Sequence, residues 1–557
     1  MSAAPFADPL WLSRKASPYY NKSHSQLQEA VREYVDKEIA PFCDEWETSG
    51  FVPPEAQKRH AELGYAAVAA FPLARNYLNG QILPGNISPQ DWDGFHDLIV
   101  IDELARCGYL GIVWALGCGN SIGLPPVIQF GSDAQKRQFL PDALSGKTRF
   151  CLAVTEPDAG SDVAGITTTA IRQGSKYIVN GAKKWITNGI FADYCTAAVR
   201  TGGPGSSGIS ALIISLKAPG VTCKKIENAG VHASGSTYIE FDEVEVPVSN
   251  LLGEENKGFP IIMNNFNHER LWLACTALRL GRVCVEDAFN HALKRETFDK
   301  KLIENQVIRA KFSAVGRRLD AGYALMENLV YVSEATAKNG NDGFLSGQFA
   351  NLKVFAGQIL ELANREAQQV MGGIGYSKKG RGARVEQISR DVRVLVIGGG
   401  SEEILADLAV KQEQKAVNKL LATAAFAAAS LVQADCYGSG ESWDGDSFKA
   451  VEAAQTLCSD VYYRTFANLE FKTRCVNLSS NKKVDFTITM GSLRLPIDIG
   501  QDACNDFLKR EILGCEHGGR STYTFYPIED NIPDGQPLNV ISVDADFISD
   551  PSSGQCA

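Results

Sequence analysis

Apolar residues in the first part of the chain recur at the spacing of an amphipathic helix. A series with a four-residue period starts after His24 and ends near Pro41, with its apolar members at Leu27, Val31, Val35 and Ile39. Charged and apolar residues alternate at a helical spacing over residues 55–64 and 90–118. This pattern predicts an N-terminal domain over residues 1–148 that is mostly helical.

The period changes near residue 150. Short runs rich in β-branched and aromatic residues follow, at Tyr177–Asn180, Tyr194–Arg200, Ile209–Leu216 and Tyr238–Phe241. The dipeptides Asn180-Gly181 and Asn188-Gly189 between them are typical turn signals. The pattern predicts a middle domain over residues 149–262 that is an antiparallel sheet or a small barrel.

Helical periodicity returns from Phe266 to about Leu405, with breaks at Lys338–Gly343 and Lys378–Gly382. This length fits four long helices, so we expect a four-helix bundle over residues 263–414. Strands and helices do not alternate along the chain, which argues against a doubly wound nucleotide-binding fold. The predicted fold class is therefore α+β.

Composition and charge narrow the possible partners. The chain has 557 residues, of which 45% are hydrophobic and 22% charged, an ordinary globular balance. At ~100–200 residues per domain, this length predicts three to five domains. The net charge of −10 provides no overall basic field for nucleic acid or an anionic membrane. No uninterrupted apolar run reaches the ~18–20 residues that span a bilayer, so no membrane partner is expected.

The cysteines divide the chain into two parts. Eight lie before residue 435 without a CxxC pair, as is typical of reduced intracellular proteins. Six lie in residues 435–557, at Cys436, Cys458, Cys475, Cys504, Cys515 and Cys556. An even set at this density predicts a disulfide framework. We therefore expect a small, cysteine-rich α+β tail domain over residues 435–557.

Residues 415–434 connect the bundle to this tail. A basic stretch, Lys415–Lys419, precedes an apolar run that ends in Val432-Gln433-Ala434. This order is that of a secretory signal peptide, and the alternative interpretation of the segment is an Ala-rich extension of the last bundle helix. The tail resembles small, cysteine-rich secreted fungal proteins. One hypothesis is a gene-model fusion of two neighbouring genes, and the alternative is a true tail domain with reduced thiols.

Four motifs carry a family resemblance. Two lie in the sheet domain, Thr155–Asp162 at its start and Lys184–Gly189 further along the same domain. The other two, Gln369–Tyr376 and Arg390–Arg393, lie late in the bundle. In this order and spacing they resemble the acyl-CoA dehydrogenase family over roughly residues 25–412. The resemblance implies FAD bound between the sheet domain and the bundle, and α,β-dehydrogenation of an acyl-CoA thioester. It also implies a homodimer or homotetramer, and electron-transfer flavoprotein or O₂ as the electron acceptor.

The resemblance assigns roles residue by residue. The threonine hydroxyls at 155 and 187 suit the polar edge of the flavin, Trp185 suits its face, and Arg295 suits the pyrophosphate. The full set of implied FAD contacts is Leu152, Val154, Thr155, Ser161, Trp185, Thr187, Arg295, Thr297, Phe298, Gln306, Gln369, Gly372, Gly373, Ser401 and Glu403. The implied substrate contacts are Ser161, Phe266, Arg270 and Gly399.

The resemblance offers two positions for the catalytic base. Most family members place a Glu after the Arg-Asp motif, but here that position is Gly399. Isovaleryl-CoA and long-chain acyl-CoA dehydrogenases place it early in the first bundle helix, where this chain has Glu269. We expect Glu269 to be the base, with a pKa that burial raises. The alternative is an ordinary first-turn helix residue that the macrodipole favours.

The sequence leaves alternatives for the activity and for the location of the protein. Because Gly399 removes the common base, a non-catalytic flavoprotein scaffold is an alternative to the enzyme, and an acyl-CoA oxidase that uses O₂ is another. No metal site is predicted. We expect an intracellular protein, with mitochondrion, peroxisome and cytoplasm all open. Residues 1–20 are acid-poor like a mitochondrial presequence, but Pro5 and Pro9 argue against one.

Overall fold

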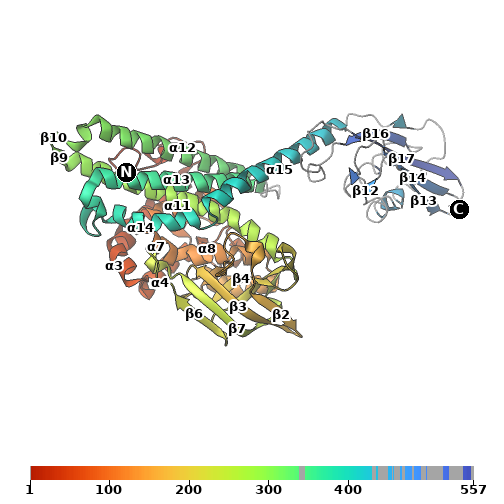
Figure 1. Cartoon of the computed structure of the whole chain (residues 1–557), viewed down its shortest axis with the longest axis horizontal. Helices are drawn as coiled ribbons and strands as arrows, with labels where there is room; N and C mark the ends of the chain where they lie inside the picture. The colour runs from red at the N-terminus through yellow and green to blue at the C-terminus, as the bar shows by residue number, and fades with distance from the viewer. Residues whose placement is uncertain are drawn as a thin grey trace. The chain divides into compact units, whose positions relative to one another are not determined.

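The computed structural model describes residues 2–337 and 345–429, and only short segments beyond residue 429. The chain divides into two compact units, Met1–Gln414 and Lys415–Ala557 (Figure 1). The first unit contains the helical, sheet and bundle regions that the sequence predicts, and each is described below.

The N-terminal region is helical, as predicted. The helix expected from His24 to about Pro41 starts as α2 and continues through a π-helical turn, Val35–Ile39, and a 3₁₀ turn, Ala40–Phe42. The region contains α1 (Leu10–Arg14), α2 (Lys22–Tyr34), α3 (Cys43–Ser49), α4 (Pro54–Glu62), α5 (Tyr65–Val68), α6 (Gly94–Ala105), α7 (Leu110–Val113), α8 (Gly119–Gly123), α9 (Pro125–Phe130) and α10 (Asp133–Leu144).

One helical stretch of the described residues, Leu110–Phe130, is long and apolar enough to cross a membrane. It includes a second π-helical turn, η5 (Trp114–Cys118), between α7 and α8. The sequence analysis expected no stretch of this kind, because it looked for an uninterrupted apolar run. Inside the fold, 78% of this stretch is buried, so it packs as a core segment of the first unit.

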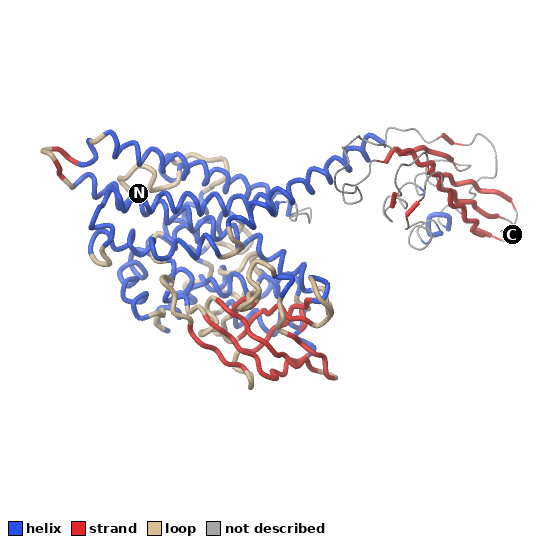
Figure 2. The backbone as a smooth tube through the Cα atoms, in the orientation of Figure 1, coloured by secondary structure: helices blue, strands red, loops and turns tan. Residues whose placement is uncertain are grey.

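The middle region is an eight-stranded sheet with the order β6-β7-β3-β2-β4-β5-β8, in which β1 pairs with β4 (Figure 2). Most pairs are antiparallel, as predicted, but β1 and β2 both run parallel to β4. The strands are β1 (Phe150–Ala153), β2 (Thr169–Gln173), β3 (Lys176–Ile186), β4 (Tyr194–Arg200), β5 (Ile209–Ser215), β6 (Val221–Lys225), β7 (Thr237–Pro247) and β8 (Leu251–Leu252).

The turn predicted at Asn180-Gly181 is wrong. These residues lie inside β3, where the register against β7 shifts between Val179 and Gly181. Gly181 has a φ of +142°, and a Cβ there would lie 2.7 Å from the Cα of Thr168. The glycine therefore permits a bulge and a close backbone approach within the strand, rather than a turn.

The bundle consists of α11 (Gly258–Lys294), α12 (Gln306–Ala337), α13 (Ser346–Met371) and α14 (Ala383–Ile397), followed by α15 (Glu402–Ala429). The break expected at Lys378–Gly382 contains a 3₁₀ turn, η13 (Gly380–Gly382), while the one at Lys338–Gly343 lies outside the described residues. A hairpin of β9 (Glu296–Thr297) and β10 (Lys300–Lys301) joins α11 to α12. The end of α11, the start of α12 and the end of α13 therefore share one end of the bundle (Figure 1).

The two largest apolar clusters of the described residues lie in the helical and sheet regions of the first unit. One runs from the N-terminal helices into the bundle and includes Leu98, Leu278 and Leu360. The other fills the sheet and includes Val179 and Phe241. The larger cluster joins the N-terminal helices to the bundle helices. The helices before and after the sheet in the sequence therefore share one core.

The described segments of the second unit form an antiparallel sheet with the order β11-β16-β17-β14-β13, and a separate β12–β15 pair. The strands are β11 (Asp435–Cys436), β12 (Thr465–Phe466), β13 (Phe471–Ser479), β14 (Lys482–Met490), β15 (Ile497–Asp498), β16 (Gly519–Phe525) and β17 (Val543–Ser553). Cys475 on β13 is disulfide-bonded, whereas all eight cysteines of the first unit are free thiols.

The apolar segment before the tail is helical where it is described. Leu420–Ala429 continues α15, and residues 430–434 lie outside the described residues. A helix fits both interpretations of this segment, since signal-peptide cores and bundle helices share the same local structure. Two of the six tail cysteines lie in the described strands. Cys475 is disulfide-bonded, and Cys436 is known only as a residue of β11.

Candidate active site

Glu269 lies on α11 directly opposite Gly399. A Cβ at Gly399 would lie 3.6 Å from Oε1 of Glu269. The Glu269 side chain is half-buried, and its Oε2 is shielded from solvent without a hydrogen-bond partner. The two positions predicted for a base therefore meet at one place in the fold, where one supplies a carboxyl and the other has no side chain.

The surroundings of Glu269 change its acidity. Burial raises the pKa of Glu269 to about 7, although the charges of Arg270, Lys353 and His268 act in the opposite direction. Cys118 of η5 also faces it, and the Glu269 charge adds to the burial that raises the pKa of this thiol. A carboxyl that titrates near 7 can accept a proton at physiological pH and hold it.

The glycine turn beside Glu269 is held by two cations. Gly399 and Gly400 have φ values of +68° and +115°, which favour glycine. Nε of Arg270 donates a hydrogen bond of 3.2 Å to the Gly399 carbonyl. Nζ of Lys353 on α13 donates to the carbonyls of Gly400, at 2.7 Å, and Val396. Arg270, which the resemblance assigns to substrate, thus donates to the chain's own turn.

Sequence reasoning missed Lys353. The signal that could have found it is a lysine on the apolar face of α13, three and four residues from the buried pairs Phe349–Ala350 and Ala356–Gly357. A lysine on such a face is buried when the helix packs, and a buried ammonium needs acceptors.

The predicted flavin-side residues lie together at the edge of β3. The backbone N–H of Lys184 donates to the Thr155 carbonyl at 2.9 Å, so Thr155 lies beside Trp185. Trp185 has a φ of +65° and is 53% exposed, so its indole stands out from the sheet. Thr187 begins the turn that follows, and Ser161 is exposed in the loop after Thr155.

A buried ion pair between Lys183 and Glu156 lies next to these residues and anchors the Thr155 segment. Nζ of Lys183 donates to Oε1 of Glu156 at 2.7 Å and to the Val154 carbonyl at 2.9 Å. Glu156 also accepts hydrogen bonds from Thr167 and Thr168. Burial raises the pKa of Glu156, but Lys183 and these hydrogen bonds lower it to about 2. The pair therefore ties the Thr155 segment to β3 next to Trp185.

An apolar cluster joins the sheet to α11. Leu152 and Val154 are buried in it, and Phe266 packs against it. The Arg270 guanidinium lies over the Phe266 ring, 5.7 Å from its centroid. Ser401 and Glu403 follow the glycine turn at the start of α15, where Glu403 is exposed and the Ser401 carbonyl accepts a hydrogen bond from Leu405.

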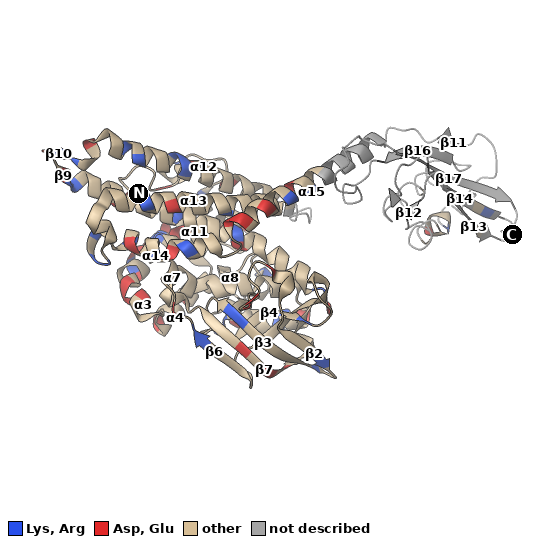
Figure 3. Cartoon of the chain, in the orientation of Figure 1, with Lys and Arg blue, Asp and Glu red and all other residues tan. Residues whose placement is uncertain are grey.

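The other predicted FAD residues share the far end of the bundle. They are Arg295, Thr297, Phe298, Gln306, Gln369, Gly372 and Gly373. Figure 1 shows the β9–β10 hairpin well away from β3, and Figure 3 shows Lys and Arg gathered on this hairpin and the nearby part of α12. Phe298 is 93% exposed, and a Cβ at Gly372 or Gly373 would meet no atom within 4 Å.

This arrangement divides the predicted FAD residues into two sets that do not meet within one chain. The set at β3 offers hydroxyls and an exposed indole, and the set at the bundle end offers cations and bare backbone. These chemistries fit the two halves of FAD, a flavin ring and an adenosine pyrophosphate.

His268 does not face the same way as Glu269. Its Nε2 lies 2.8 Å from Oδ2 of Asp97, and its ring stacks on Phe71 with centroids 5.1 Å apart. The sequence analysis did not identify this pair. It anchors α11 against α6 one residue before Glu269.

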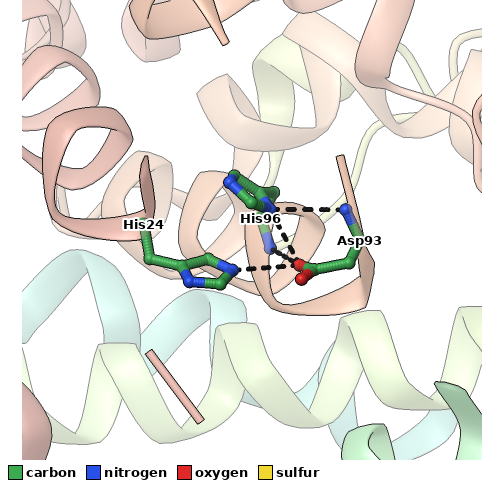
Figure 4. A group of neighbouring side chains, drawn as sticks. All are labelled: His24, Asp93 and His96. Carbon is green, nitrogen blue, oxygen red and sulfur yellow. Dashed lines mark hydrogen bonds and ion pairs between the residues drawn. The ribbon is translucent and has the colours of Figure 1, made fainter. Parts of the chain in front are cut away.

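A second cluster, His24, Asp93 and His96, has the composition of a metal site (Figure 4). Nε2 of His24 and Nδ1 of His96 lie 3.0 and 2.8 Å from Oδ1 of Asp93. The N–H of Asn21 donates to Nδ1 of His24 at 3.0 Å, so Nε2 of His24 carries the proton toward Asp93. Both histidines complete capping boxes at the starts of α2 and α6, which explains the cluster structurally.

Comparisons with known proteins identify the family of the chain. The sequence matches the family models "Acyl-CoA dehydrogenase, N-terminal domain" over residues 21–147, "middle domain" over 151–244 and "C-terminal domain" over 256–413. "Acyl-CoA dehydrogenase AFT10-1" of Alternaria alternata is 51% identical, and the match covers 75% of this chain and 98% of that protein. "Acyl-CoA dehydrogenase apdG" of Emericella nidulans is 43% identical over 74% of this chain and 95% of its own length.

More distant relatives extend the likeness. A probable acyl-CoA dehydrogenase from Mycobacterium abscessus has a solved structure with a TM-score of 0.64 and 32% identity, covering 71% of this chain and 99% of that chain. "Caffeyl-CoA reductase-Etf complex subunit CarC" of Acetobacterium woodii is 28% identical over 69% of this chain and 97% of its own length.

Proposed function

Because the chain belongs to the acyl-CoA dehydrogenase family, we propose that Glu269 is the base that removes the α-proton of its substrate. The enzyme catalyses the FAD-dependent dehydrogenation of an acyl-CoA thioester. One observation carries the proposal: the Glu269 carboxyl and the side-chain-free Gly399 occupy the same place, so the usual base is replaced from the opposite side.

Removal of the α-proton requires a carboxylate base with a raised pKa. The α-proton of a thioester is weakly acidic, so its removal needs a base that is held in place and titrates near the working pH. Oε2 of Glu269 is shielded and unpartnered, and is therefore free to take this proton. When bound, FAD supplies the acceptor for the hydride that leaves the β-carbon. The proton stays on Glu269 until the product leaves.

The direct test is the visible spectrum of the purified enzyme during anaerobic titration with acyl-CoA thioesters. Glu269→Gln should keep the yellow colour of bound flavin and lose bleaching by at least about a thousandfold in rate. Glu33→Gln, an exposed glutamate paired with Lys37, is the matched control and should bleach normally. Normal bleaching by Glu269→Gln would instead favour a different base.

A yellow protein that no acyl-CoA reduces would favour the scaffold alternative. In that case the wild-type protein would fail to bleach as well as Glu269→Gln. If only Glu269→Gln fails to bleach, the loss is that of the base. The series should include branched and straight acyl chains, since the glycine run leaves the acyl group unspecified.

We also propose that two copies of the chain complete each FAD site. The flavin-side residues Thr155, Trp185 and Thr187 would come from one copy, and Arg295 with its neighbours from the other. The support is that these sets lie apart within one chain, and that Phe298 is almost fully exposed. A homodimer is the smallest assembly that joins them, and a homotetramer pairs two such dimers.

Complementation tests this arrangement. A subunit with Glu269→Gln and one with Arg295→Glu should each be inactive alone. Mixed dimers should recover up to about half of the activity, because one site then combines an intact Glu269 with an intact Arg295. If each site lies within one chain, mixing will recover none.

We propose electron-transfer flavoprotein, rather than O₂, as the acceptor. A relative described as a subunit of an Etf complex supports this choice. Enzyme reduced anaerobically by substrate should regain its yellow colour quickly with electron-transfer flavoprotein and slowly in air. Rapid reoxidation in air would support the oxidase alternative.

We propose an intracellular location, in the mitochondrion, peroxisome or cytoplasm, and we propose that the segment around Phe6 and Ala7 is kept in the mature enzyme. The buried Arg279 and Arg282 donate to the carbonyls of Ala7 and Phe6, at 3.0 and 2.8 Å. Removing that segment would take away these backbone acceptors and leave Arg279 with Asp102 and Arg282 with Asp320, so the segment packs as part of the folded enzyme. Mass spectrometry of the purified protein's first peptide tests this, and a start beyond residue 15 would contradict it.

For the tail we propose a gene-model fusion. The family match ends at residue 413, and a disulfide at Cys475 follows a unit of free thiols. Such thiols and disulfides belong to different redox compartments. Continuous transcript reads across residues 405–440 would contradict the fusion and favour a true tail domain.

A further inference from the structure

Lys353 is a buried cation next to the proposed base. It lies near the middle of α13 and is 2% exposed, among Phe349, Leu352 and Ala356. Burial lowers the pKa of Lys353 to about 8, and Glu269 acts in the opposite direction. A buried ammonium is destabilising unless acceptors surround it, so its position calls for an explanation in terms of what it holds.

Its acceptors are both backbone carbonyls at the glycine turn. Val396 lies in the last turn of α14, where the helix dipole places partial negative charge, and Gly400 closes the turn. Lys353 therefore bridges the two ends of the Gly398–Gly400 segment. No side chain of that segment can do this, because it has none.

Arg270 holds the middle of the same segment from the other side. Its Nε donates to the Gly399 carbonyl, and its side chain is 7% exposed. Two cations, one on α11 and one on α13, thus fix three carbonyls of a turn whose glycines would otherwise sample many conformations. Gly399 faces Glu269, so the conformation of this turn decides how much space the carboxyl has.

The charged and titratable groups around Glu269 are few. Arg270 and His268 are its neighbours on α11, although His268 points toward Asp97, Lys353 faces it from α13, and Cys118 faces it from η5. Glu402 at the start of α15 faces Lys353. Arg270 and Lys353 both donate to the glycine turn and both favour the Glu269 carboxylate, Arg270 from the same helix and Lys353 from α13.

We propose that Lys353 is a positioning residue for the reaction: it bridges Val396 and Gly400, keeps the glycine turn open beside Glu269, and stabilises the Glu269 carboxylate through space. This inference rests on the proposed role of Glu269. Its hydrogen bonds go to the backbone of the turn, so it acts on the reaction through the turn and through Glu269.

The first test is the pH profile of flavin bleaching in the intact enzyme at saturating acyl-CoA. The rate should rise with pH as Glu269 deprotonates. With Lys353→Met the midpoint should move up by about one pH unit, because the carboxylate loses a nearby positive charge. Lys353→Arg, which keeps the charge, should leave the midpoint near its original value even if the rate falls.

A second readout does not depend on activity. Stability against urea is measured from pH 5 to 9 for the protein with and without Glu269→Gln, and the pH midpoint of the difference reports the titration of Glu269. Repeating the comparison in the Lys353→Met background should move this midpoint upward by a similar amount. Lys353→Gln serves as a second neutral variant if Lys353→Met does not fold.

Unchanged midpoints in the neutral variants would overturn the proposal, as would an equal shift in Lys353→Arg. Lys37→Met, the same replacement at an exposed ion pair, controls for general charge effects and should move neither midpoint. If Glu269→Gln retains bleaching, the proposed base is wrong, but the stability comparison still decides whether Lys353 and Glu269 are coupled.

Discussion

At the scale of single residues, the exchange between Glu269 and Gly399 explains the departure from the common family pattern. Gly399 combines a φ of +68° with a close approach to Leu273, whose Cδ1 would lie 2.7 Å from a Cβ there. A glutamate at 399 would therefore need a different turn and would face a second carboxyl. The carboxyl on α11 and the glycine in the turn therefore fit together at this place.

The first prediction concerns Gly399→Ala. A side chain at a φ of +68° is strained, and contact with Leu273 adds to this, so we expect a loss of about 1–3 kcal/mol in the free energy of unfolding. Urea denaturation measures it. Gly203→Ala is the control, since a Cβ there meets no atom within 4 Å. Equal stability of both variants would show that the turn adapts freely.

The second prediction follows from the raised pKa of Glu269. Because its pKa is about 7 in the fold and about 4.3 in the unfolded chain, the native state binds more protons between these values. The stability that Glu269 contributes is therefore present below pH 4.3 and lost as pH rises through 7. Glu269→Gln should become more stable relative to the wild type over this window, as thermal unfolding at several pH values would reveal. A pH-independent difference would contradict the raised pKa.

At the scale of elements, β3 positions Trp185, one of the predicted flavin-side residues, because its neighbours fix the strand on both sides. Its bulge at Gly181 passes over Thr168, and its buried Lys183 reaches back to Glu156. The exposed Trp185 follows two residues later, on a stretch where the register against β7 shifts again. The irregular strand therefore turns one indole outward while its backbone stays anchored.

The third prediction tests that anchor. Lys183→Met leaves Glu156 buried without its cation, so we expect destabilisation by about 3–5 kcal/mol in urea or thermal unfolding. Lys176→Met on the same strand removes only an exposed partner of Glu245, for which we expect at most about 1 kcal/mol. Adding Glu156→Gln to Lys183→Met should recover part of the loss. The idea fails if both lysine variants are equally mild.

At the scale of the whole first unit, three regions meet at one buried carboxyl. Asp391 of α14 accepts hydrogen bonds from the backbone N–H groups of Val231 and Leu110, at 2.9 and 3.2 Å. Glu47 of α3 accepts from His232 beside it, at 2.6 Å. Burial and the Glu47 charge raise the pKa of Asp391 to about 7. The Arg-Asp motif therefore ties the bundle to the sheet and the N-terminal helices.

The fourth prediction concerns this junction. Asp391→Ala leaves two buried N–H groups unpaired, so we expect destabilisation by about 2–4 kcal/mol and a lower unfolding temperature. Asp242→Ala, at an exposed position of β7, should change stability by about 0.5 kcal/mol or less. If limited proteolysis of Asp391→Ala found the three regions as firmly joined as in the wild type, the junction would lie elsewhere.

Much of the fold could be predicted because it depends on local pattern. The change from helical period to β-branched runs and back located the three regions, and the motifs carried the family. Asn180-Gly181 was misread as a turn because the same dipeptide suits a bulge when neighbouring strands hold it. Lys353 was missed because its acceptors, Val396 and Gly400, lie more than forty residues away.

The sequence by itself determined the order of helices and strands, the family, and the loss of the usual base at Gly399 with a carboxyl at Glu269. These are statements about residue identity and spacing, which a single chain carries in full. Only the tertiary structure decided that Glu269 and Gly399 face each other, that Arg270 and Lys353 hold the turn between them, and that the two sets of predicted FAD residues lie apart. Those facts depend on which helices pack together, because burial and the pairing of buried charges are set by neighbours distant in sequence.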